Sequence, residues 1–534
     1  MSDSQDIETA TTAIQTSQVA QPDSKTRRYD RQLRLWAATG QSSLESARIL
    51  VCSGSATSTS VLKNLVLPGV GHFTILDAHV VTPEDAGNNF FLEGLDSVGK
   101  SRAEEAVRLL SELNDGVEGQ ANTANLDDIL EKDPSYITSF SLVIAHNLPS
   151  STLDRLATLL WSNTSFPPLI VIRSAGFLAE IFIQFHEHPI IDSHPETPAS
   201  LRIDKPFPAL LDHALKLDIE NMDVIDHGNI PYVVILVRAL EEWKASHNGS
   251  PPKTYEEKSE FKKGLLARKK KADEENFDEA AAQAYRVWTE TTVPNEISKL
   301  FSDPGVTSLT PSSPAFFHLL KALQQFSSQP PHTLPLSSTL PDMKSDTASY
   351  VHLQKLYKAR AEEEKLVFKS ILKKNGAPVD DAIVDEFVKN AHGLKLLRGE
   401  KWGSLDADKN ALSACLKGNT KETATHLALS ALARIQAANP SVQPTEDDLR
   451  TAVLALIGGE LPRSSSGEVI GESELEEAIG ELARAPTADL PNTAAFLGGL
   501  VAQEAIKMIT RQYVPVKGVC VVDLIGSWTG VVQP

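Results

Sequence analysis

The stretch RILVCSGSATSTSVLKNLVLPGVGHFTILD, residues 48–77, decides the fold of this chain. Its first apolar run, Ile49–Val51, predicts a buried strand, and the apolar residues between Val61 and Val66 recur with the spacing of a helix. After a Pro-Gly break, a second apolar run ends on Asp77. A strand, a turn of small residues, a helix and a second strand with an acidic residue at its end are the layout of an α/β domain of the dinucleotide-binding type.

The turn inside this unit departs from the pattern that binds phosphate. That pattern, G-x-G-x-x-G, needs glycines because a Cβ would obstruct the tight bend, the approach of the phosphates and the packing of helix on strand. The corresponding positions are Ser53, Ser55 and Ser58. The sequence therefore keeps the signal for the fold and weakens the signal for a nucleotide. The alternative is a variant phosphate loop in which serine hydroxyls replace the backbone contacts.

The composition limits the class of protein. A chain of 534 residues predicts roughly two to four domains, and 41% hydrophobic with 23% charged residues is typical of globular domains. The formal net charge of −19 disfavours nucleic-acid binding, because most of the surface would repel a phosphate backbone. A basic protein partner remains compatible with this charge.

The three cysteines, Cys52, Cys415 and Cys520, are widely scattered. They form neither a C-x-x-C pair nor a set with the spacing of metal ligands. We therefore expect no metal site and no disulfide framework, and we interpret all three thiols as structural.

The first 26 residues predict a disordered tail, since they are polar and lack the apolar core of a secretory signal. No apolar run in the chain approaches the roughly 18 residues of a membrane span. We expect no membrane partner, and a location in the cytoplasm and nucleus.

The rest of the chain shows two kinds of sequence pattern, one typical of an α/β domain and one mainly helical. Residues 27–174 contain two further buried strands between amphipathic helices, which predicts a mostly parallel sheet covered on both faces. Residues 175–485 begin with FLAEIFIQF (177–185), a pattern typical of an exposed antiparallel strand, and then become mainly helical. Residues 486–534 return to a helix and a buried strand. We therefore expect a Rossmann-like α/β domain that is interrupted by a large, mainly helical insertion.

Two shorter features have local interpretations. The first helix, which carries arginines on one side and leucines on the other, begins near Arg27 and is expected to end at Gly40. The basic run Arg268–Lys271 is interpreted as a solvated helix face, and the alternatives are a nuclear address or a docking patch.

Several motifs, in order along the chain, carry a resemblance to a known family. They are YDRQLRLW, LKNLVLPGVGHFTILD, DAGNNFF with VGKSRA, EHPIIDSHP, RIDKPFP, PPKTYEEKSEF and AAFLGGLVAQEAIKMITRQYV. From about Arg27 onward the chain resembles the regulatory subunits of the heterodimeric enzymes that activate ubiquitin-like modifiers of the Nedd (Rub) type. The resemblance implies an adenylation domain of the kind shared by ubiquitin-activating and molybdopterin-biosynthesis proteins.

The resemblance also implies two related halves, of which one adenylates the modifier and the other is a degenerate copy. The active half uses glycines at the turn, an Asp for the ribose, an Asn-Arg-Gln triplet, a Lys and an Asp for magnesium. The matching positions here are Ser53, Ser55, Ser58, Asp77, then Gly87, Asn88 and Asn89, Lys100, and His146 with Asn147. The phosphate approach, a cation and the metal ligand are missing, so we expect that this chain binds no cofactor and that the partner subunit binds Mg-ATP.

Arg31, in the motif YDRQ, is the exception to this loss. The resemblance implies that it reaches across the dimer to the phosphates of the nucleotide bound by the partner. A planar guanidinium suits this role because it can pair with two phosphate oxygens at once. The alternative is that Arg31 belongs only to the exposed basic side of the first helix.

Three partners follow from the resemblance: the catalytic subunit of a heterodimer, a Nedd-type modifier and its conjugating enzyme. The helical insertion takes the place of the family's catalytic-cysteine domain and shows no nucleophile motif, so we expect it to shape a groove for the modifier or the conjugating enzyme. Three alternatives stay open: an independent nucleotide-dependent enzyme, a scaffold without activating function, and a regulatory subunit for a SUMO-type modifier.

Overall fold

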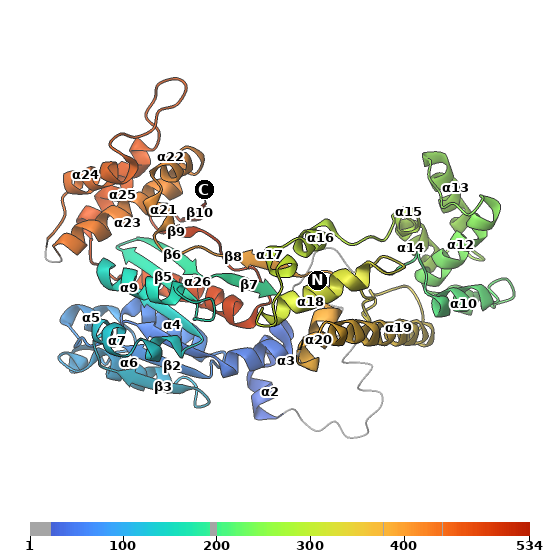
Figure 1. The fold of residues 1–534 in the computed structure, drawn as a ribbon, viewed down its shortest axis with the longest axis horizontal. Helices are drawn as coiled ribbons and strands as arrows, with labels where there is room; N and C mark the ends of the chain where they lie inside the picture. The colour runs from blue at the N-terminus through green and yellow to red at the C-terminus, as the bar shows by residue number, and fades with distance from the viewer. Residues whose placement is uncertain (1–22, 193–199, 378, 440–441, 534) are drawn as a thin grey trace. The chain divides into compact units, whose positions relative to one another are not determined.

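The computed structural model describes residues 23–192, 200–377, 379–439 and 442–533. Its contacts divide the chain into two units, which we describe separately (Figure 1). The sheet unit comprises the described residues of Pro22–Ile190 and Leu396–Pro534, and the helical unit comprises those of Ile191–Lys395. Within the described ranges, no helix is both long and apolar enough to cross a membrane.

The sheet unit is built on an eight-stranded sheet with the strand order β10-β9-β6-β5-β4-β1-β2-β3. Its parallel half consists of β1 Arg48–Cys52, β2 His72–Leu76, β3 Glu118–Asn122, β4 Leu142–His146 and β5 Leu169–Ala175. Its antiparallel extension consists of β6 Leu178–Gln184, β9 Val519–Asp523 and β10 Trp528–Val532. This topology confirms the predicted α/β class.

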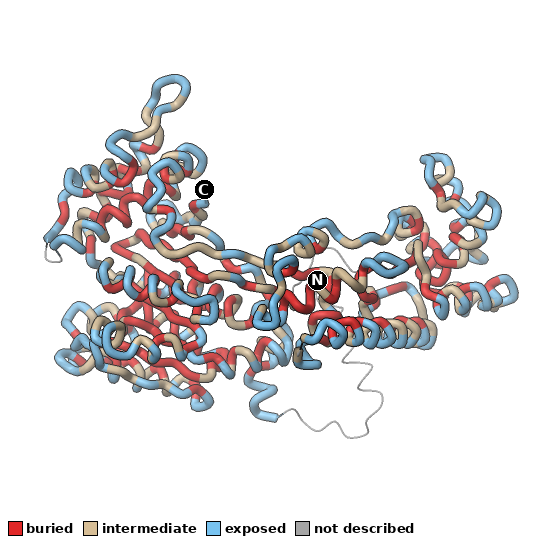
Figure 2. Tube along the Cα trace, viewed as in Figure 1, coloured by how far each residue is buried: buried red, intermediate tan, exposed pale blue. Residues whose placement is uncertain are grey.

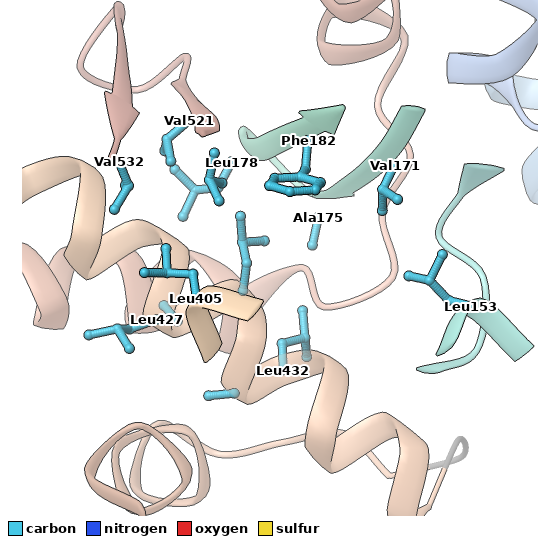
Figure 3. Packing of buried hydrophobic residues seen from close by; sticks show 14 of the residues in the cluster. Leu153, Val171, Ala175, Leu178, Phe182, Leu405, Leu427, Leu432, Val521 and Val532 are labelled. Carbon is cyan, nitrogen blue, oxygen red and sulfur yellow. The ribbon is translucent and has the colours of Figure 1, made fainter. Parts of the chain in front are cut away.

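Helices cover both faces of the sheet, because alternate strand residues belong to two different apolar clusters. Ile49 and Val51 of β1 lie in one cluster, and Leu50 and Cys52 lie in the other. The helices of the first cluster are α4 Ala56–Val66, α6 Arg102–Ser111 and α26 Pro491–Thr510. Those of the second include α9 Ser150–Trp161 and α23 Thr420–Ala438 (Figure 3). Strands β2 and β4 are accordingly buried along their whole length (Figure 2).

Residues 404–484 pack in the sheet unit. Their helices are α21 Ser404–Ala407, α22 Lys409–Gly418, α23, α24 Glu446–Ile457 and α25 Glu472–Arg484. They share the second cluster with Val171 and Phe182 of the sheet (Figure 3). The structure thus changes units at 190/191 and 395/396, whereas the expected insertion ran from 175 to 485. Helical periodicity does not reveal which core a helix joins.

Strand β6, within the FLAEIFIQF stretch, lies inside the sheet, and the prediction of an exposed strand was wrong. All of its residues are buried, and β9 pairs with its free edge so that Phe182 lies opposite Val519. The antiparallel direction was predicted correctly. The one carboxylate in this strand, Glu180, is buried and takes part in a charge network.

This network joins the sheet to α21 and α23. The Glu180 carboxylate pairs with Arg173 of β5, and its Oε2 lies 2.7 Å from Nδ1 of His426. Nε2 of His426 lies 2.7 Å from Oδ1 of Asp406, whose other oxygen accepts from Ser430 Oγ. Burial alone would lower the pKa of His426, but the two carboxylates outweigh it and raise the pKa to about 10. The imidazole is therefore a cation at neutral pH.

The described chain begins with α2 Ser24–Arg28, which Asp23 caps by accepting a hydrogen bond from Thr26 N. This helix includes the end of the range that was expected to be a tail. Residues 1–22 of that prediction lie outside the described residues.

The next helix, α3 Asp30–Ser46, does not end at Gly40 as predicted. It kinks at Trp36 and Ala37 and then continues. Gln512 Nε2 donates to the Trp36 carbonyl at 2.8 Å, so a carbonyl group near the break is still hydrogen-bonded. The sequence pattern hid this partner because it lies beyond α26.

The other elements assigned near the sheet are short. They are α5 Pro83–Asn88, a 3₁₀ helix Gly94–Ser97, α7 Leu126–Lys132, α8 Pro134–Thr138, and a two-stranded sheet of β7 Glu187–Ile190 and β8 Lys395–Arg398.

The helical unit has its own core, which contains the fully buried side chains of Tyr232, Phe277 and Tyr357. Its helices are α10 Pro208–Lys216, α11 Val224–His227, α12 Tyr232–Ser246, α13 Tyr255–Leu266, α14 Glu275–Gln283, α15 Tyr285–Trp288, α16 Asn295–Phe301, α17 Pro304–Thr307, α18 Ala315–Ser327, α19 Thr347–Lys374 and α20 Asp381–Lys389. A buried ion pair, Arg202 with both carboxylate oxygens of Glu364 at 2.6 and 2.8 Å, joins the segment before α10 to α19.

The basic run Arg268–Lys271 lies in the turn after α13 and not on a helix face. Arg268 pairs with Glu242, and Lys269 pairs with Asp278. Lys270 Nζ donates to three backbone carbonyls, the shortest bond being 2.7 Å to Met222. Most of the run therefore holds the helical unit together.

Candidate functional site

The candidate site lies at the carboxyl ends of β1 and β4, the neighbouring strands where the chain reverses its direction across the sheet. This crevice is where open α/β sheets bind ligands. The turn after β1, with Ser53 and Ser55, leads into α4, and β4 ends there on His146. The structure brings together the predicted residues Ser53, Ser55, Ser58, Asp77 and Asn89, through hydrogen bonds that involve this turn.

Ser53 keeps the backbone shape of the glycine that the pattern calls for. Its φ angle is +125°, in a region that residues with a Cβ seldom adopt. Its N–H donates to the carbonyl of Leu76 at 3.1 Å, which fixes the bend. The turn has therefore retained the geometry of a phosphate loop without its glycine.

The start of α4, where a phosphate would bind, is occupied by groups of the chain itself. Ser55 is the N-cap, and its Oγ accepts from Ser58 N at 3.2 Å. Asp489 accepts from Thr57 N at 3.2 Å and from Thr57 Oγ1 at 2.6 Å. Because the N-terminus of a helix attracts anions, the Asp489 carboxylate satisfies donors at the helix end that binds phosphate in nucleotide-binding domains.

His146 occupies the place where the resemblance predicts a magnesium ligand. Its ring is 2% exposed and lies between two hydroxyls, with Nδ1 2.7 Å from Ser55 Oγ and Nε2 2.8 Å from Ser174 Oγ. Burial lowers the pKa of His146, so the ring is neutral near pH 7. Asn147 is bonded to the backbone of Ser174 on both sides of its amide.

Both carboxylate oxygens of Asp77, the expected ribose ligand, accept hydrogen bonds from groups of this chain. It accepts from Gly54 N at 2.6 Å, from Arg102 Nε at 2.7 Å and from His79 N at 2.9 Å. Burial would raise the pKa of Asp77, but the Arg102 guanidinium and these donors outweigh it and hold the pKa below its usual value. A ribose hydroxyl would have to break one of these bonds.

Of the residues that match the family's triplet and lysine, Asn89 is buried and structural, whereas Lys100 lies on the surface. Asn89 is buried, donates to the Gly54 carbonyl at 3.1 Å and accepts from Thr59 Oγ1 at 2.9 Å, so it fixes the turn. Asn88 ends α5. Lys100 is exposed, and its Nζ lies 3.9 Å from Glu105. Neither Asn88 nor Lys100 contributes to the bonded cluster around Asp77.

Sequence reasoning missed Arg102 and Asp489, which close the pocket. Arg102 follows Lys100 by two positions in the VGKSRA motif, so the motif pointed to the right segment. Asp489 carried no signal because it precedes α26, far from the turn in sequence. Among the residues that the structure describes, no group of three or more His, Cys, Asp or Glu side chains could hold a metal ion.

Arg31 lies apart from this cluster, on the exposed first part of α3. Its side chain makes no ion pair or hydrogen bond with any described residue, whereas its neighbour Arg34 pairs with Asp30 at 3.2 Å. The helix is held in place by Tyr29, which is buried and accepts from Asn114 Nδ2 at 2.9 Å. Arg31 is thus an unpaired cation at the start of a fixed helix.

Cys415 offers no nucleophile. It lies in the sheet unit, its Sγ donates to the Gln533 carbonyl at 3.3 Å, and burial raises the pKa of its thiol. Cys52 and Cys520 are buried as well. The sequence from 191 to 395, which forms the helical unit, contains no cysteine.

Comparisons with known proteins extend over almost the whole chain. Residues 29–147 match the ThiF family model. The NEDD8-activating enzyme E1 regulatory subunit of Xenopus laevis is 35% identical over 517 residues, which cover 92% of this chain and 95% of that protein. The regulatory subunit AXR1 of Arabidopsis thaliana is 34% identical and covers 92% and 93%. The regulatory subunit of Saccharomyces cerevisiae is 27% identical and covers 92% and 96%.

Proposed function

The chain belongs to the family of NEDD8-activating enzyme E1 regulatory subunits, and on this premise we propose that it is the non-catalytic half of a heterodimer that activates a NEDD8-type modifier. The catalytic subunit binds Mg-ATP, adenylates the C-terminal carboxylate of the modifier and accepts the acyl group on its own cysteine. This chain completes that subunit without performing the chemistry.

The closed pocket is the observation that carries this proposal. Asp489 occupies the phosphate position, Arg102 neutralises Asp77, and His146 stands where a metal ligand would be needed. Mg-ATP would have to displace the Asp489 carboxylate, and at the end of β4 it would meet the neutral His146 ring where the resemblance predicts a carboxylate for its metal. The chain keeps the fold of an adenylation domain, but the polar groups of its pocket are already paired with one another. This supports a non-catalytic role.

Arg31 is proposed to act on the partner's nucleotide. A guanidinium stabilises the charge that develops on phosphates during adenylation, and this one has no internal partner among the described residues to give up. Arg31 takes no part in the hydrogen-bonded cluster around Asp77, which fits a role outside its own subunit. The anchored helix would hold the charge in a defined position.

An exposed apolar surface supports the pairing of the two subunits. Val80, Phe90, Leu95 and Val98, which we call the apolar patch, all lie between β2 and α6, and Phe90 and Leu95 are 83% and 79% exposed. Several large exposed apolar side chains in one segment are a feature of protein interfaces. We propose that the catalytic subunit covers the apolar patch.

The helical unit is proposed to contact the modifier or its conjugating enzyme. The absence of cysteine from residues 191–395 supports a binding role, because this unit has no nucleophile for a thioester. The pattern RIDKPFP, residues 202–208, which carried part of the family resemblance, lies near the beginning of this unit.

The test is reconstitution with the catalytic subunit, ATP and the NEDD8-type modifier, scored by ATP–pyrophosphate exchange and by thioester formation. We expect activity only with both chains, and the thioester on the catalytic subunit. Arg31→Ala should leave the heterodimer intact and slow the exchange by about 10²-fold or more, as other lost transition-state donors do. Arg34→Ala, one turn along the same helix, is the matched control.

Two results would overturn the proposal. One is saturable binding of Mg-ATP by this chain alone, measured by calorimetry. The other is full exchange activity of the catalytic subunit without this chain. Wild-type exchange by Arg31→Ala would remove only the role of Arg31.

A further inference from the structure

A cavity lies at the amino ends of the parallel strands β4 and β5, opposite the carboxyl ends where the closed pocket lies. Its volume is about 380 Å³, and its lining includes Ser141 just before β4, Pro168 just before β5 and Gln184 at the end of β6. Thr164 and Ser165 contribute hydroxyls. All lining residues belong to the sheet unit.

Arg511 lines this cavity and has an unusual backbone. It is the C-cap of α26 with φ +56° and ψ 32°, a left-handed conformation that favours glycine or asparagine. Its side chain forms no hydrogen bond or ion pair with any described residue. The residue as a whole is exposed, and the atoms packed around its guanidinium lower the pKa of that group by desolvation. A strained backbone therefore presents a cation that lacks a counter-ion, and such strain is often kept for function.

His188 lines the same cavity and also lacks a partner. The residue is 3% exposed, and its Nε2 is among the buried polar atoms without a hydrogen bond in the described structure. Burial, together with the charge of Arg511, lowers the pKa of His188 to about 4. The ring is thus neutral near pH 7, and an acceptor beside Arg511 would satisfy an Nε2–H.

No carboxylate in the cavity lining is available to neutralise the charge of Arg511. Glu187 is the carboxylate in the lining, and it pairs with Arg398 at 3.0 Å. His186 stacks on Trp161 and contacts the Trp161 carbonyl through Nε2 at 3.0 Å. A second cation, Arg48, lies with its Cζ 5.4 Å from the ring centre of Phe140, another lining residue.

We propose that this cavity binds an oxyanion, a carboxylate or phosphate group, through the Arg511 guanidinium and His188 Nε2, with the hydroxyls of Ser141, Thr164 and Ser165 available as further donors. Guanidinium and imidazole donors in a partly buried site are a common arrangement for such groups. The site is independent of the proposed pairing with a catalytic subunit.

Calorimetric titration of sulfate into the full chain, at constant ionic strength with chloride as the balancing anion, tests this. We expect one saturable site. Arg511→Asn should bind sulfate about tenfold to a hundredfold more weakly, because charge-assisted hydrogen bonds are lost, while asparagine tolerates the left-handed conformation and preserves the fold. His188→Phe, which keeps a ring against Phe185, should weaken binding severalfold. Arg155→Asn, which removes an exposed arginine paired with Asp127, should have no effect.

Parallel titrations with inorganic phosphate and with succinate distinguish the source of the oxyanion. Tighter binding of phosphate assigns the site to a phosphate group, and tighter binding of succinate assigns it to a carboxylate. The proposal is overturned if none of the three anions binds saturably, or if Arg511→Asn binds them as the wild type does. In that case Arg511 only stabilises the C-terminus of α26.

Discussion

Thr57 and Asp489 are hydrogen-bonded to each other although 432 positions separate them in the chain. Thr57 Oγ1 donates to Oδ1 of Asp489 at 2.6 Å, and Thr57 N donates to Oδ2 at 3.2 Å. A carboxylate from the segment before α26 thus binds the helix end that holds phosphate in nucleotide-binding domains.

Asp489→Ala should lower the free energy of unfolding by about 1–2 kcal/mol, because the donors of Thr57 lose a charged acceptor. Urea denaturation followed by circular dichroism measures the change. Asp96→Ala, at an exposed aspartate, is the control and should leave stability unchanged. Equal midpoints for all three proteins would show that Asp489 contributes nothing to the closure.

Ser53→Gly should raise the free energy of unfolding by up to about 1 kcal/mol. Glycine removes the strain at φ +125°, and the gain exceeds the entropy that glycine loses on folding. Ser42→Gly, in the interior of α3, provides the contrast: there we expect a loss of roughly 0.5 kcal/mol. Thermal and urea unfolding of both variants decide the matter, and a destabilised Ser53→Gly protein would mean that the serine hydroxyl matters more than the backbone.

Phe90→Asp and Leu95→Asp should each weaken pairing with the catalytic subunit by about thirtyfold or more, since an exposed aromatic or leucine side chain covered by a partner is a typical hot spot. Analytical ultracentrifugation of the mixed subunits measures the dissociation constant. Leu366→Asp, at a 66% exposed position of α19, is the matched control in the helical unit. If the control weakened pairing while the two patch variants did not, the interface would lie elsewhere.

His426 should make stability depend on pH in alkaline solution. Its folded pKa of about 10 lies above the unfolded value near 6.5, so its contribution is fully present below about pH 6.5 and is lost as the pH rises toward 10. His426→Gln should remove this slope and cost about 3–5 kcal/mol, because the buried Glu180 and the partly buried Asp406 lose their shared cation. Urea midpoints at intervals between pH 6 and 10, for wild type and variant, give both quantities. Parallel pH curves would contradict the assignment.

The sequence was sufficient wherever the signal was local. The apolar run of β1, the helical spacing of α4 and the serines of the turn lie within a few residues of one another, and they predicted both the fold and the loss of the nucleotide pattern. The serine at position 53 even keeps the glycine conformation. Local patterns record backbone geometry because each element needs its own side chains to form.

The parts that sequence reasoning missed depend on contacts between distant segments. Asp77 suggested a ribose ligand, and only its bonds to Arg102 show that it is occupied. The pattern FLAEIFIQF suggested an exposed strand, and only the contacts of Glu180 with Arg173 and His426 explain why a carboxylate is buried there. The helices at 404–484 showed a clear helical periodicity, but nothing in the sequence indicated that they pack against the sheet. In each case the deciding partner lies far away along the chain.

The pairing of β6 with β9 affects how the protein is made. Synthesis produces Leu178–Gln184 long before Val519–Asp523, so the nascent sheet has an open apolar edge during translation of all the residues between them. Shortening the chain before residue 519 would leave it permanently open to self-association.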